Sequence, residues 1–288
     1  MNLRRRSLLA VPALGAALAV LPRASQAQGT PIRFGVGPLQ PTPGDTRRVY
    51  EPFFAHLAKA LSRPFELVAT TDWAGIAIAL ANEQVDCAWL GPWGYVIARD
   101  KSGCDALTVV KYRDKPTYQA IIMSRPDLKI EHFPEDAKGL TISFTDAGST
   151  SGWLIPHFWF KTHNIDPHSY FKYHDGASHA AQSIAVVSGQ VDLATDFDRN
   201  LNAMVAAGRV KEEQVKIVWR SDPLPNDALA VRKGLDAETR ATIAKVALGI
   251  DAASAGAILP PNYTGWIPAR PDTYATIEAA GRALGKLA

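Results

Sequence analysis

Residues 146–152 are Asp-Ala-Gly-Ser-Thr-Ser-Gly, a turn around which the rest of the sequence can be organised. A short β-branched run (140–144) precedes the turn, and a segment of helical character (153–161) follows it. A turn between a strand and a helix presents backbone N–H groups at the positive end of the helix dipole. The turn is therefore a candidate site for a phosphate-like anion, and it needs no lysine or arginine for this purpose.

The hydroxyls of Ser149, Thr150 and Ser151 add three hydrogen-bond donors at the same place. The alternative is an ordinary helix N-cap, because serine and threonine are favoured there for structural reasons alone. One capping hydroxyl is expected, whereas three in a row between two glycines exceed what capping requires. The pattern therefore favours the anion site.

The first 27 residues have the pattern of a secretory signal peptide. Three arginines (4–6) lead into an apolar run that ends at Leu21, and Ala24-Ser25-Gln26-Ala27 offers small residues for cleavage after Ala27. Paired arginines before the run suggest the twin-arginine route, and Sec export stays open. The apolar run is about 14 residues, too short for a comfortable span. We expect an exported, periplasmic protein without stable membrane insertion.

The net charge of the mature chain is close to zero. The whole sequence carries +3, but residues 1–27 hold four arginines and no acid, which leaves +3 − 4 = −1. Charges of both signs are interspersed along the mature chain. This composition argues against nucleic acid and against an anionic membrane as partners.

Two cysteines, Cys87 and Cys104, are the only ones in the sequence. A disulfide that closes this short loop is possible in an oxidising compartment. Cys87 lies in an apolar run typical of a buried strand, so a buried free thiol is an equal alternative. Two cysteines without nearby histidines predict no zinc site, and we expect no metal and no cofactor.

Short strands and helices alternate along the chain, which is the pattern of mostly parallel sheets covered on both faces. Two alternating blocks predict two lobes: residues 28–116 with 225–288, and residues 117–224. Crossings near 112–118 and 221–224 would join them around a cleft that closes by a hinge. Strands are predicted near 31–37, 65–69, 85–90, 106–111, 118–124, 140–144, 170–173, 191–195, 215–219 and 228–231. Helices are predicted near 46–62, 72–82, 93–100, 153–161, 179–188, 200–207, 236–251 and 271–287.

Five motifs in order resemble a known family: residues 72–75, 85–91, 146–152 with Pro156 following, 189–195 and 223–227. The sequence is similar to the periplasmic phosphonate- and phosphite-binding proteins of ABC importers, from about residue 32 to about residue 250. The resemblance implies the fold of a type II periplasmic binding protein, an α/β protein of two lobes. Each lobe has a mixed, mostly parallel sheet flanked by helices, and two hinge crossings join the lobes.

The resemblance also implies roles for individual residues. Ser149, Thr150 and Ser151 correspond to the hydroxyls that grip the phosphonate oxygens in the family. Tyr118 and His179 fall where a tyrosine and a histidine also reach the oxyanion.

At the other end of the ligand, Trp73 stands where the family commonly has a tyrosine at the edge of the opposite lobe. Asp227 matches a carboxylate that helps to hold the ammonium of aminoalkyl phosphonates. The second carboxylate of that cage is missing, because the position 20 residues after His179 is Arg199. The adjacent Asp198 could replace it only if the loop shifts. An arginine there would repel an ammonium and would favour a second anionic group, or pair with Asp227.

Each of these residues also has an ordinary structural interpretation. Trp73 and Tyr118 are candidates for core packing. His179 at a helix start is a candidate cap, and Asp227 is a candidate turn cap after a proline. Arg199 on the surface would be the commonest outcome for an arginine.

The leading hypothesis is a binding protein rather than an enzyme. It would capture a phosphonate, phosphite or related phosphorus oxyanion in the interlobe cleft and deliver it, as a monomer, to an ABC transporter permease. The alternative is a periplasmic oxyanion sensor, for example of arsenite, that signals to a membrane histidine kinase and uses Cys87 or Cys104 as a soft ligand. An enzyme is third, because no Gly-x-Ser-x-Gly elbow is present around Ser149–Ser151.

Overall fold

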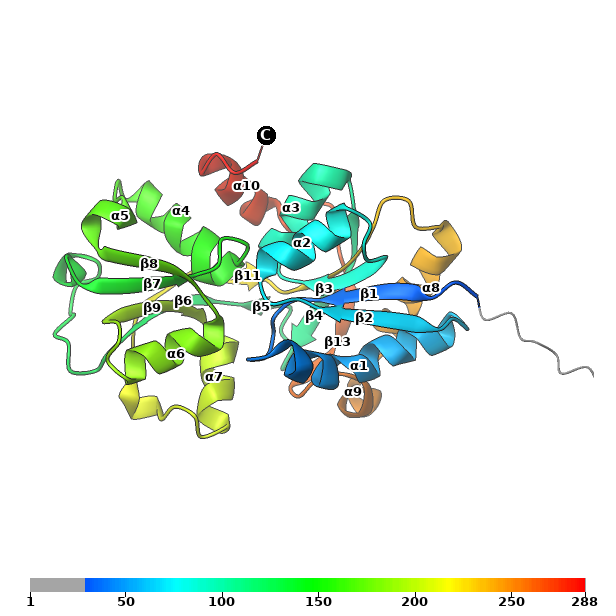
Figure 1. The fold of residues 1–288 in the computed structure, drawn as a ribbon, viewed down its shortest axis with the longest axis horizontal. Helices are drawn as coiled ribbons and strands as arrows, with labels where there is room; N and C mark the ends of the chain where they lie inside the picture. Colours follow the sequence, from blue (N-terminus) through cyan, green and yellow to red (C-terminus); the bar gives the residue numbers. More distant parts are fainter. Residues whose placement is uncertain (1–28, 288) are drawn as a thin grey trace, which may run out of the picture.

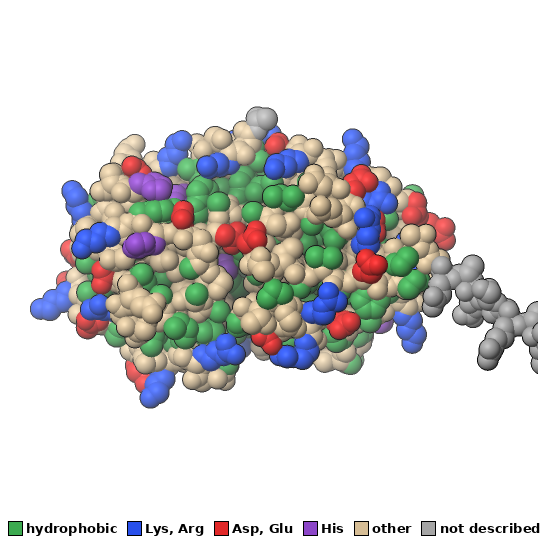
Figure 2. Space-filling model, viewed as in Figure 1, with side chains coloured by type: hydrophobic (Ala, Val, Ile, Leu, Met, Phe, Trp, Pro, Cys, Tyr) green, Lys and Arg blue, Asp and Glu red, His purple; other side chains and the backbone are tan. Residues whose placement is uncertain are grey.

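The computed structural model describes residues 29–287, so the predicted signal peptide lies outside the described residues. The chain forms two α/β bodies side by side, each built on one central sheet with helices on its faces (Figure 1). On the face shown in Figure 2, acidic and basic side chains are interspersed rather than gathered by sign. This surface fits the near-neutral charge of the mature chain.

The first sheet has six strands in the order β13-β4-β12-β3-β1-β2. β1 is parallel to β2 and β3, while β12 is antiparallel to both β3 and β4, and β13 is antiparallel to β4. Four of the six strands (β1, β2, β3, β4) therefore point the same way. The strands are β1 (Ile32–Val36), β2 (Phe65–Ala69), β3 (Cys87–Leu90), β4 (Asp105–Tyr112), β12 (Ala228–Val231) and β13 (Tyr263–Pro268), and the helices are α1 (Pro43–Ala60), α2 (Trp73–Ala81), α3 (Pro92–Ser102), α8 (Ala237–Leu248), α9 (Ala252–Ile258) and α10 (Ala275–Ala283).

The second sheet has five strands in the order β10-β6-β9-β7-β8. β7 is parallel to β8 and β9, and β6 is antiparallel to β9 and β10, so four of the five strands share a direction. The strands are β6 (Ala120–Ser124), β7 (Thr141–Thr145), β8 (Lys172–Ala177), β9 (Leu193–Phe197) and β10 (Lys216–Arg220). The helical elements are η1 (Glu135–Ala137), η2 (Thr150–Leu154), α4 (Ile155–Thr162), α5 (Pro167–Tyr170), α6 (His179–Val187), α7 (Asp198–Ala206) and η3 (Glu212–Gln214).

The chain crosses between the two bodies twice. β5 (Thr117–Tyr118) and β11 (Leu224–Pro225) pair antiparallel in a two-stranded ribbon, with Tyr118 opposite Leu224. The ribbon lies between the two sheets (Figure 1). Two crossings in one ribbon, as predicted, are the arrangement expected of a hinge.

Buried apolar side chains fill both faces of each sheet. On one face of the first sheet, Trp89 contacts Tyr50 edge-on at 4.9 Å and packs against Trp266 at 4.6 Å. The cluster on the opposite face continues into the second body, because it contains Trp93 from α3 together with Leu154 from η2. The two bodies therefore share apolar contacts at their junction, where α10 also packs against α3 and α4.

The structure corrects several predicted boundaries. The strand predicted over 118–124 is two strands, because Tyr118 pairs in the ribbon while Ala120 begins the sheet. Tyr170, predicted in a strand, instead ends the helical turn α5, and β8 begins at Lys172. The long helix predicted over 236–251 ends at Leu248, and α9 and β13 follow where no element was predicted.

Both cysteines are free and buried. Burial raises the pKa of both thiols, that of Cys104 to about 12.

Among residues 29–287 no cluster of three or more histidine, cysteine or carboxylate side chains is arranged to hold a metal ion. Within the same range no single helix is long and apolar enough to cross a membrane, and the one pair that passes together, α8 with α9, is bent by 110°.

Candidate anion-binding site

The Asp-Ala-Gly-Ser-Thr-Ser-Gly turn joins the end of β7 to η2, in the second body. Ser149 caps η2, because its Oγ accepts the Gly152 N–H at 3.1 Å. The Leu154 N–H donates to the Ser149 carbonyl at 3.0 Å, five residues back, so the first turn is a wide π-turn. A Cβ on Gly152 would lie 2.0 Å from the Thr145 Oγ1, so only glycine fits there. The second glycine of the motif thus has a packing role.

The first glycine of the motif lies against the first body. A Cβ on Gly148 would lie 2.3 Å from the backbone nitrogen of Ala74, at the start of α2. Next to it, the Asp146 carboxylate accepts the Trp73 N–H at 3.2 Å and the Gly148 N–H at 3.0 Å. A side chain of the second body therefore satisfies an N–H at the N-terminus of a helix of the first body.

A second contact across the junction involves α3. The Trp93 N–H donates to the Thr150 Oγ1 at 2.8 Å, and the Trp93 indole N–H donates to the Ala147 carbonyl at 3.1 Å. Because the Thr150 oxygen accepts this bond, its own hydrogen is left for another acceptor. The turn is thus held by helix N-termini of the opposite body on both sides.

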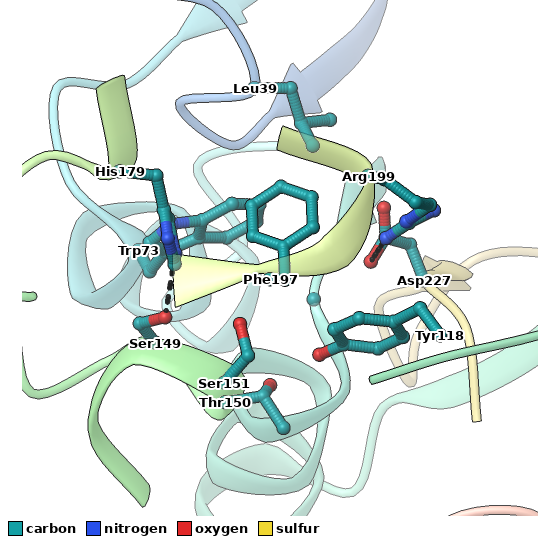
Figure 3. A pocket seen from close by; sticks show the side chains of 11 residues that line it. Leu39, Trp73, Tyr118, Ser149, Thr150, Ser151, His179, Phe197, Arg199 and Asp227 are labelled. Atoms are coloured by element: carbon teal, nitrogen blue, oxygen red, sulfur yellow. Dashed lines mark hydrogen bonds and ion pairs between the residues drawn. The ribbon is translucent and has the colours of Figure 1, made fainter. Parts of the chain in front are cut away.

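A small pocket lies between the two bodies, in front of this turn (Figure 3). Its cavity volume is about 20 Å³. A space of this size fits a small group such as a tetrahedral oxyanion better than a long chain. Its lining residues are Leu39, Trp73, Gly91, Tyr118, Ser149, Thr150, Ser151, His179, Phe197, Arg199 and Asp227.

The structure brings eight of the nine predicted site residues to this pocket. The ninth, Asp198, does not line it: its carboxylate accepts the Arg199 N–H at 2.8 Å, at the start of α7. In this conformation Asp198 does not stand in for the missing carboxylate, and its replacement of that group through a shift of the loop stays a prediction. The eight that do line the pocket are Trp73, Tyr118, Ser149, Thr150, Ser151, His179, Arg199 and Asp227.

His179 links the turn to a buried acid. Its Nε2 lies 3.0 Å from the Ser149 Oγ, and its Nδ1 lies 2.8 Å from the Asp196 Oδ1 (Figure 3 shows the first contact). Asp196 is fully buried. The imidazole is also enclosed by aromatic rings, edge-on to Phe197 at 4.7 Å and to Trp73 at 6.5 Å. This histidine is a fixed part of the pocket wall rather than a surface cap.

Arg199 points into the pocket wall, not to solvent. It is 6 % exposed, and its guanidinium lies 3.7 Å from the Asp227 carboxylate. The guanidinium also stacks near the Tyr118 ring at 4.7 Å and the Phe197 ring at 5.3 Å. Its Nε has no hydrogen-bond partner among residues 29–287. The arginine therefore pairs with Asp227, one of the two outcomes that the sequence left open.

Burial shapes the protonation of the remaining pocket groups. Burial raises the pKa of Asp227, and the Arg199 guanidinium and the Trp89 indole N–H oppose that rise. Burial also raises the pKa of Tyr118, whose hydroxyl is turned toward Ser151 and Thr150 (Figure 3). A tyrosine that keeps its proton remains a donor for an anion.

Sequence reasoning missed Leu39, Phe197 and Asp196. Leu39 lies in the loop after β1, and Phe197 ends β9, so both follow the carboxyl end of a strand. That position was an available signal, because ligands of such sheets gather there. Asp196 gave no signal in the sequence, since its partners come from two different helices.

Two α/β bodies joined by a two-stranded hinge, with a small polar pocket between them, define a two-lobed solute-binding protein. The pocket offers neutral hydroxyl and N–H donors, and its one arginine is already paired. Residues 34–274 match the family model described as "ABC transporter, phosphonate, periplasmic substrate-binding protein". The chain belongs to this family.

Two curated relatives are similar in sequence. The phosphonates-binding periplasmic protein of Escherichia coli K12 is 28 % identical over 195 residues, which cover 66 % of this chain and 58 % of that protein. The phosphate-import protein PhnD of Mycolicibacterium smegmatis is 26 % identical over 230 residues, 75 % of this chain and 71 % of that protein. The match thus spans little more than half the length of the first relative.

Solved structures share the fold. The binding-protein component of an ABC phosphonate transporter from Pseudomonas aeruginosa has a TM-score of 0.79 at 25 % identity, covering 88 % of this chain and 86 % of that one. PhnD1 from Prochlorococcus marinus, in complex with methylphosphonate, has a TM-score of 0.77 at 18 % identity, covering 89 % and 98 %. A histidine kinase sensor domain is less similar, with a TM-score of 0.51 at 17 % identity. At such identities the last two likenesses concern the fold alone.

The sensor alternative depended on a cysteine as a soft ligand, and this part of it is wrong. Cys87 and Cys104 are both fully buried in the described chain, and neither lines the pocket. Their raised pKa values further disfavour the thiolate that a soft metalloid would need.

Proposed function

We propose that this protein captures a small phosphorus oxyanion, such as phosphite or methylphosphonate, in the pocket between its two lobes. The observation that carries the proposal is the convergence of Ser149, Thr150 and Ser151, at the start of one helix, on a pocket between the two lobes. The hydroxyls of Thr150 and Ser151 and the first N–H groups of η2 supply donors to the oxygens of one tetrahedral group, and the Ser149 oxygen lies beside them. All three serine and threonine side chains are at least 96 % buried.

Neutral donors hold an anion well in such a place. Hydrogen bonds to a charged acceptor are roughly twice as strong as those between neutral groups. In a dry pocket water does not compete for them, so each bond is also stronger than it would be at the surface. Tyr118 extends the donor set beside the turn, and His179 lines the pocket next to Ser149.

The far end of the pocket favours a ligand with little or no tail. Arg199 and Phe197 occupy the side opposite the turn, and Asp227 is engaged by Arg199 and by Trp89. A cationic tail would meet the guanidinium and would find no free carboxylate. At an effective dielectric near 20, two unit charges about 4 Å apart interact by roughly 4 kcal/mol, so the guanidinium disfavours an ammonium tail and Asp227 offsets part of that repulsion.

Family membership supports a role in transport. The protein would be exported, would close its lobes over the anion as a monomer, and would deliver it to the permease of an ABC importer. In this proposal the lobes are residues 28–116 with 225–288 and residues 117–224, and they rotate about the ribbon of β5 and β11. The ligand acts by stabilising the closed state, to which both lobes contribute contacts.

Thermal unfolding with a panel of anions tests the proposal. Phosphite, methylphosphonate, phosphate, 2-aminoethylphosphonate and sulfate are each added to the mature protein. A ligand at about 1,000 times its Kd stabilises by about 4 kcal/mol, which shifts the melting temperature of a protein of this size by several degrees. We expect this shift for at least one of the first three anions. The absence of a shift with every phosphorus oxyanion contradicts the proposal.

A further inference from the structure

A buried chain of three side chains leads away from the anion turn: Ser149, His179 and Asp196. Asp196 lies at the bottom, 0 % exposed, on β9. It accepts three side-chain hydrogen bonds, from His179 Nδ1 at 2.8 Å, from Ser183 Oγ at 3.1 Å and from Asn200 Nδ2 at 2.8 Å. A carboxylate that only accepts fixes the direction of the bond from the histidine, so the hydrogen is on Nδ1.

This direction decides what Ser149 can do. With the hydrogen on Nδ1, neutral His179 has its lone pair on Nε2, which lies 3.0 Å from the Ser149 Oγ. The Ser149 oxygen already accepts the Gly152 N–H. The one hydrogen of its hydroxyl is therefore donated to His179, and none is left for a ligand.

An oxygen of a fully deprotonated oxyanion in the pocket would then face a lone pair of the Ser149 oxygen, with no hydrogen between the two atoms. One added proton removes the conflict in either of two ways. A P–OH group of the ligand can donate to the Ser149 oxygen, or the proton can sit on His179. In the second case Nε2–H donates to Ser149, and the Ser149 hydroxyl turns its hydrogen to the ligand. Both arrangements contain the same number of protons.

We infer that Asp196 is a positioning residue that couples anion capture to the uptake of one proton, and thereby selects phosphorus oxyanions over sulfate. Phosphite and phosphonates carry or gain a proton near neutral pH, since a phosphoryl group has its second pKa at about 6. Sulfate is the anion of a much stronger acid and brings no proton, so only the arrangement with the proton on His179 is open to it, whereas a phosphonate can also supply the proton itself. The inference rests on the proposed function, because it concerns the same pocket.

The other ionisable groups around His179 are Asp146 at the turn, and Arg199, Asp227 and Tyr118 in the pocket wall. Arg199 opposes an added positive charge, but Asp227 pairs with it at 3.7 Å. Asp196 is the carboxylate in direct contact with the imidazole, at 2.8 Å from Nδ1.

Calorimetric titration with methylphosphonate at about pH 9, where a phosphonate is fully deprotonated, tests the inference. Comparing two buffers of different ionisation enthalpy gives the number of protons taken up. We expect one proton per anion in the wild type, with the affinity falling about tenfold per pH unit in this range. We also expect sulfate to bind at least about 10–100-fold more weakly than methylphosphonate at neutral pH.

Two variants carry the test. Asp196→Asn offers an amide that can donate to Nδ1 and move the hydrogen to Nε2, and His179→Gln supplies a donor that does not titrate. In both variants we expect no proton uptake on binding. We also expect a smaller ratio of the affinities for methylphosphonate and sulfate than in the wild type. Ser183→Ala is the matched control, because it removes a neighbouring bond to Asp196 and leaves the imidazole contact in place.

Three outcomes separate the inference from the proposed function. Binding of methylphosphonate by the wild type without proton uptake overturns the inference and leaves the proposed function standing. Full proton uptake in both Asp196→Asn and His179→Gln also overturns it, since the proton then goes to another group. Failure of every phosphorus oxyanion to bind at any pH overturns both.

Discussion

The hydroxyl oxygen of Thr150 accepts a hydrogen bond from the backbone N–H of Trp93 at 2.8 Å, and this bond joins the anion turn of one lobe to the start of α3 in the other. The bond orients the hydroxyl, whose own hydrogen remains available to a ligand oxygen. Lobe closure and ligand contact therefore depend on the same side chain. This arrangement explains how a ligand that contacts mainly the second lobe can favour the closed state.

Replacing Thr150 by valine tests that coupling. The Thr150→Val variant keeps the shape but leaves the buried Trp93 N–H without its acceptor, at a cost of about 1–3 kcal/mol in the closed state. We expect the Kd for methylphosphonate to rise about 10–100-fold in calorimetric titration. Thr150→Ser, which retains the hydroxyl, is expected to bind within a few-fold of the wild type. Equal affinities for all three proteins contradict the prediction.

Gly148 tests the approach of the lobes directly. In Gly148→Ala the new Cβ would lie 2.3 Å from the Ala74 nitrogen, a clash between two backbones that the lobes relieve only by separating. We expect a folded protein with a larger radius of gyration in small-angle scattering and with little or no ligand binding. Gly256→Ala is the control, because no atom lies within 4 Å of its new Cβ. Tight binding by the Gly148→Ala variant contradicts the prediction, because the lobes would then close despite the added Cβ.

Arg199 is expected to determine whether the pocket accepts a ligand with a cationic tail. In Arg199→Gln the Asp227 carboxylate loses its cation and becomes available to an ammonium group. The ratio of affinities for 2-aminoethylphosphonate and methylphosphonate should shift at least about tenfold toward the amine, since charges near 4 Å interact by several kcal/mol. The double variant with Asp227→Asn removes the carboxylate and should abolish the shift. An unchanged ratio in Arg199→Gln indicates that the tail does not reach this end of the pocket.

His157 predicts a pH dependence of stability that is unrelated to the ligand. Burial lowers the pKa of His157 from 6.5 to about 4, and the ring stacks on Trp153 at 4.2 Å. The unfolded chain therefore binds a proton at a higher pH than the folded one, so stability falls as the pH drops from 6.5 to about 4.

The loss amounts to about 3 kcal/mol for a shift of this size. Urea unfolding of the wild type and of His157→Phe at several pH values measures it. The phenylalanine variant keeps the ring packing and cannot take up a proton, so its stability should decline less over this window. Parallel curves for the two proteins contradict the assignment.

Much of the fold follows from local patterns. β2 (Phe65–Ala69) and β12 (Ala228–Val231) have the predicted bounds, and Asp72 caps α2 as its position before the helix indicates. α9 and β13 were missed because their sequences carry weak local signals. β13 contains Gly265 at a φ of 136° and ends at Pro268, neither of which is typical of a strand. Its place in the sheet comes from pairing with β4.

The site was predictable to the extent that its residues follow strand ends in sequence. The sequence of the turn at 146–152 shows that three hydroxyls lie together. It does not show that Gly148 contacts the opposite lobe or that Gly152 contacts Thr145. The orientation of Arg199 was also beyond sequence reasoning, because it is set by Asp227 and by rings from other elements. Such tertiary contacts produce no periodic pattern in the sequence.

The most direct test of the central claim is calorimetric titration of methylphosphonate and phosphite into the wild type and into the Ser149→Ala, Thr150→Ala, Ser151→Ala triple variant. The wild type is expected to bind at least one of these anions at one site per chain. The triple variant, its fold checked by circular dichroism, is expected to show no measurable binding. Undiminished binding by the triple variant, or no binding of either anion by the wild type, contradicts the claim that this turn captures the ligand.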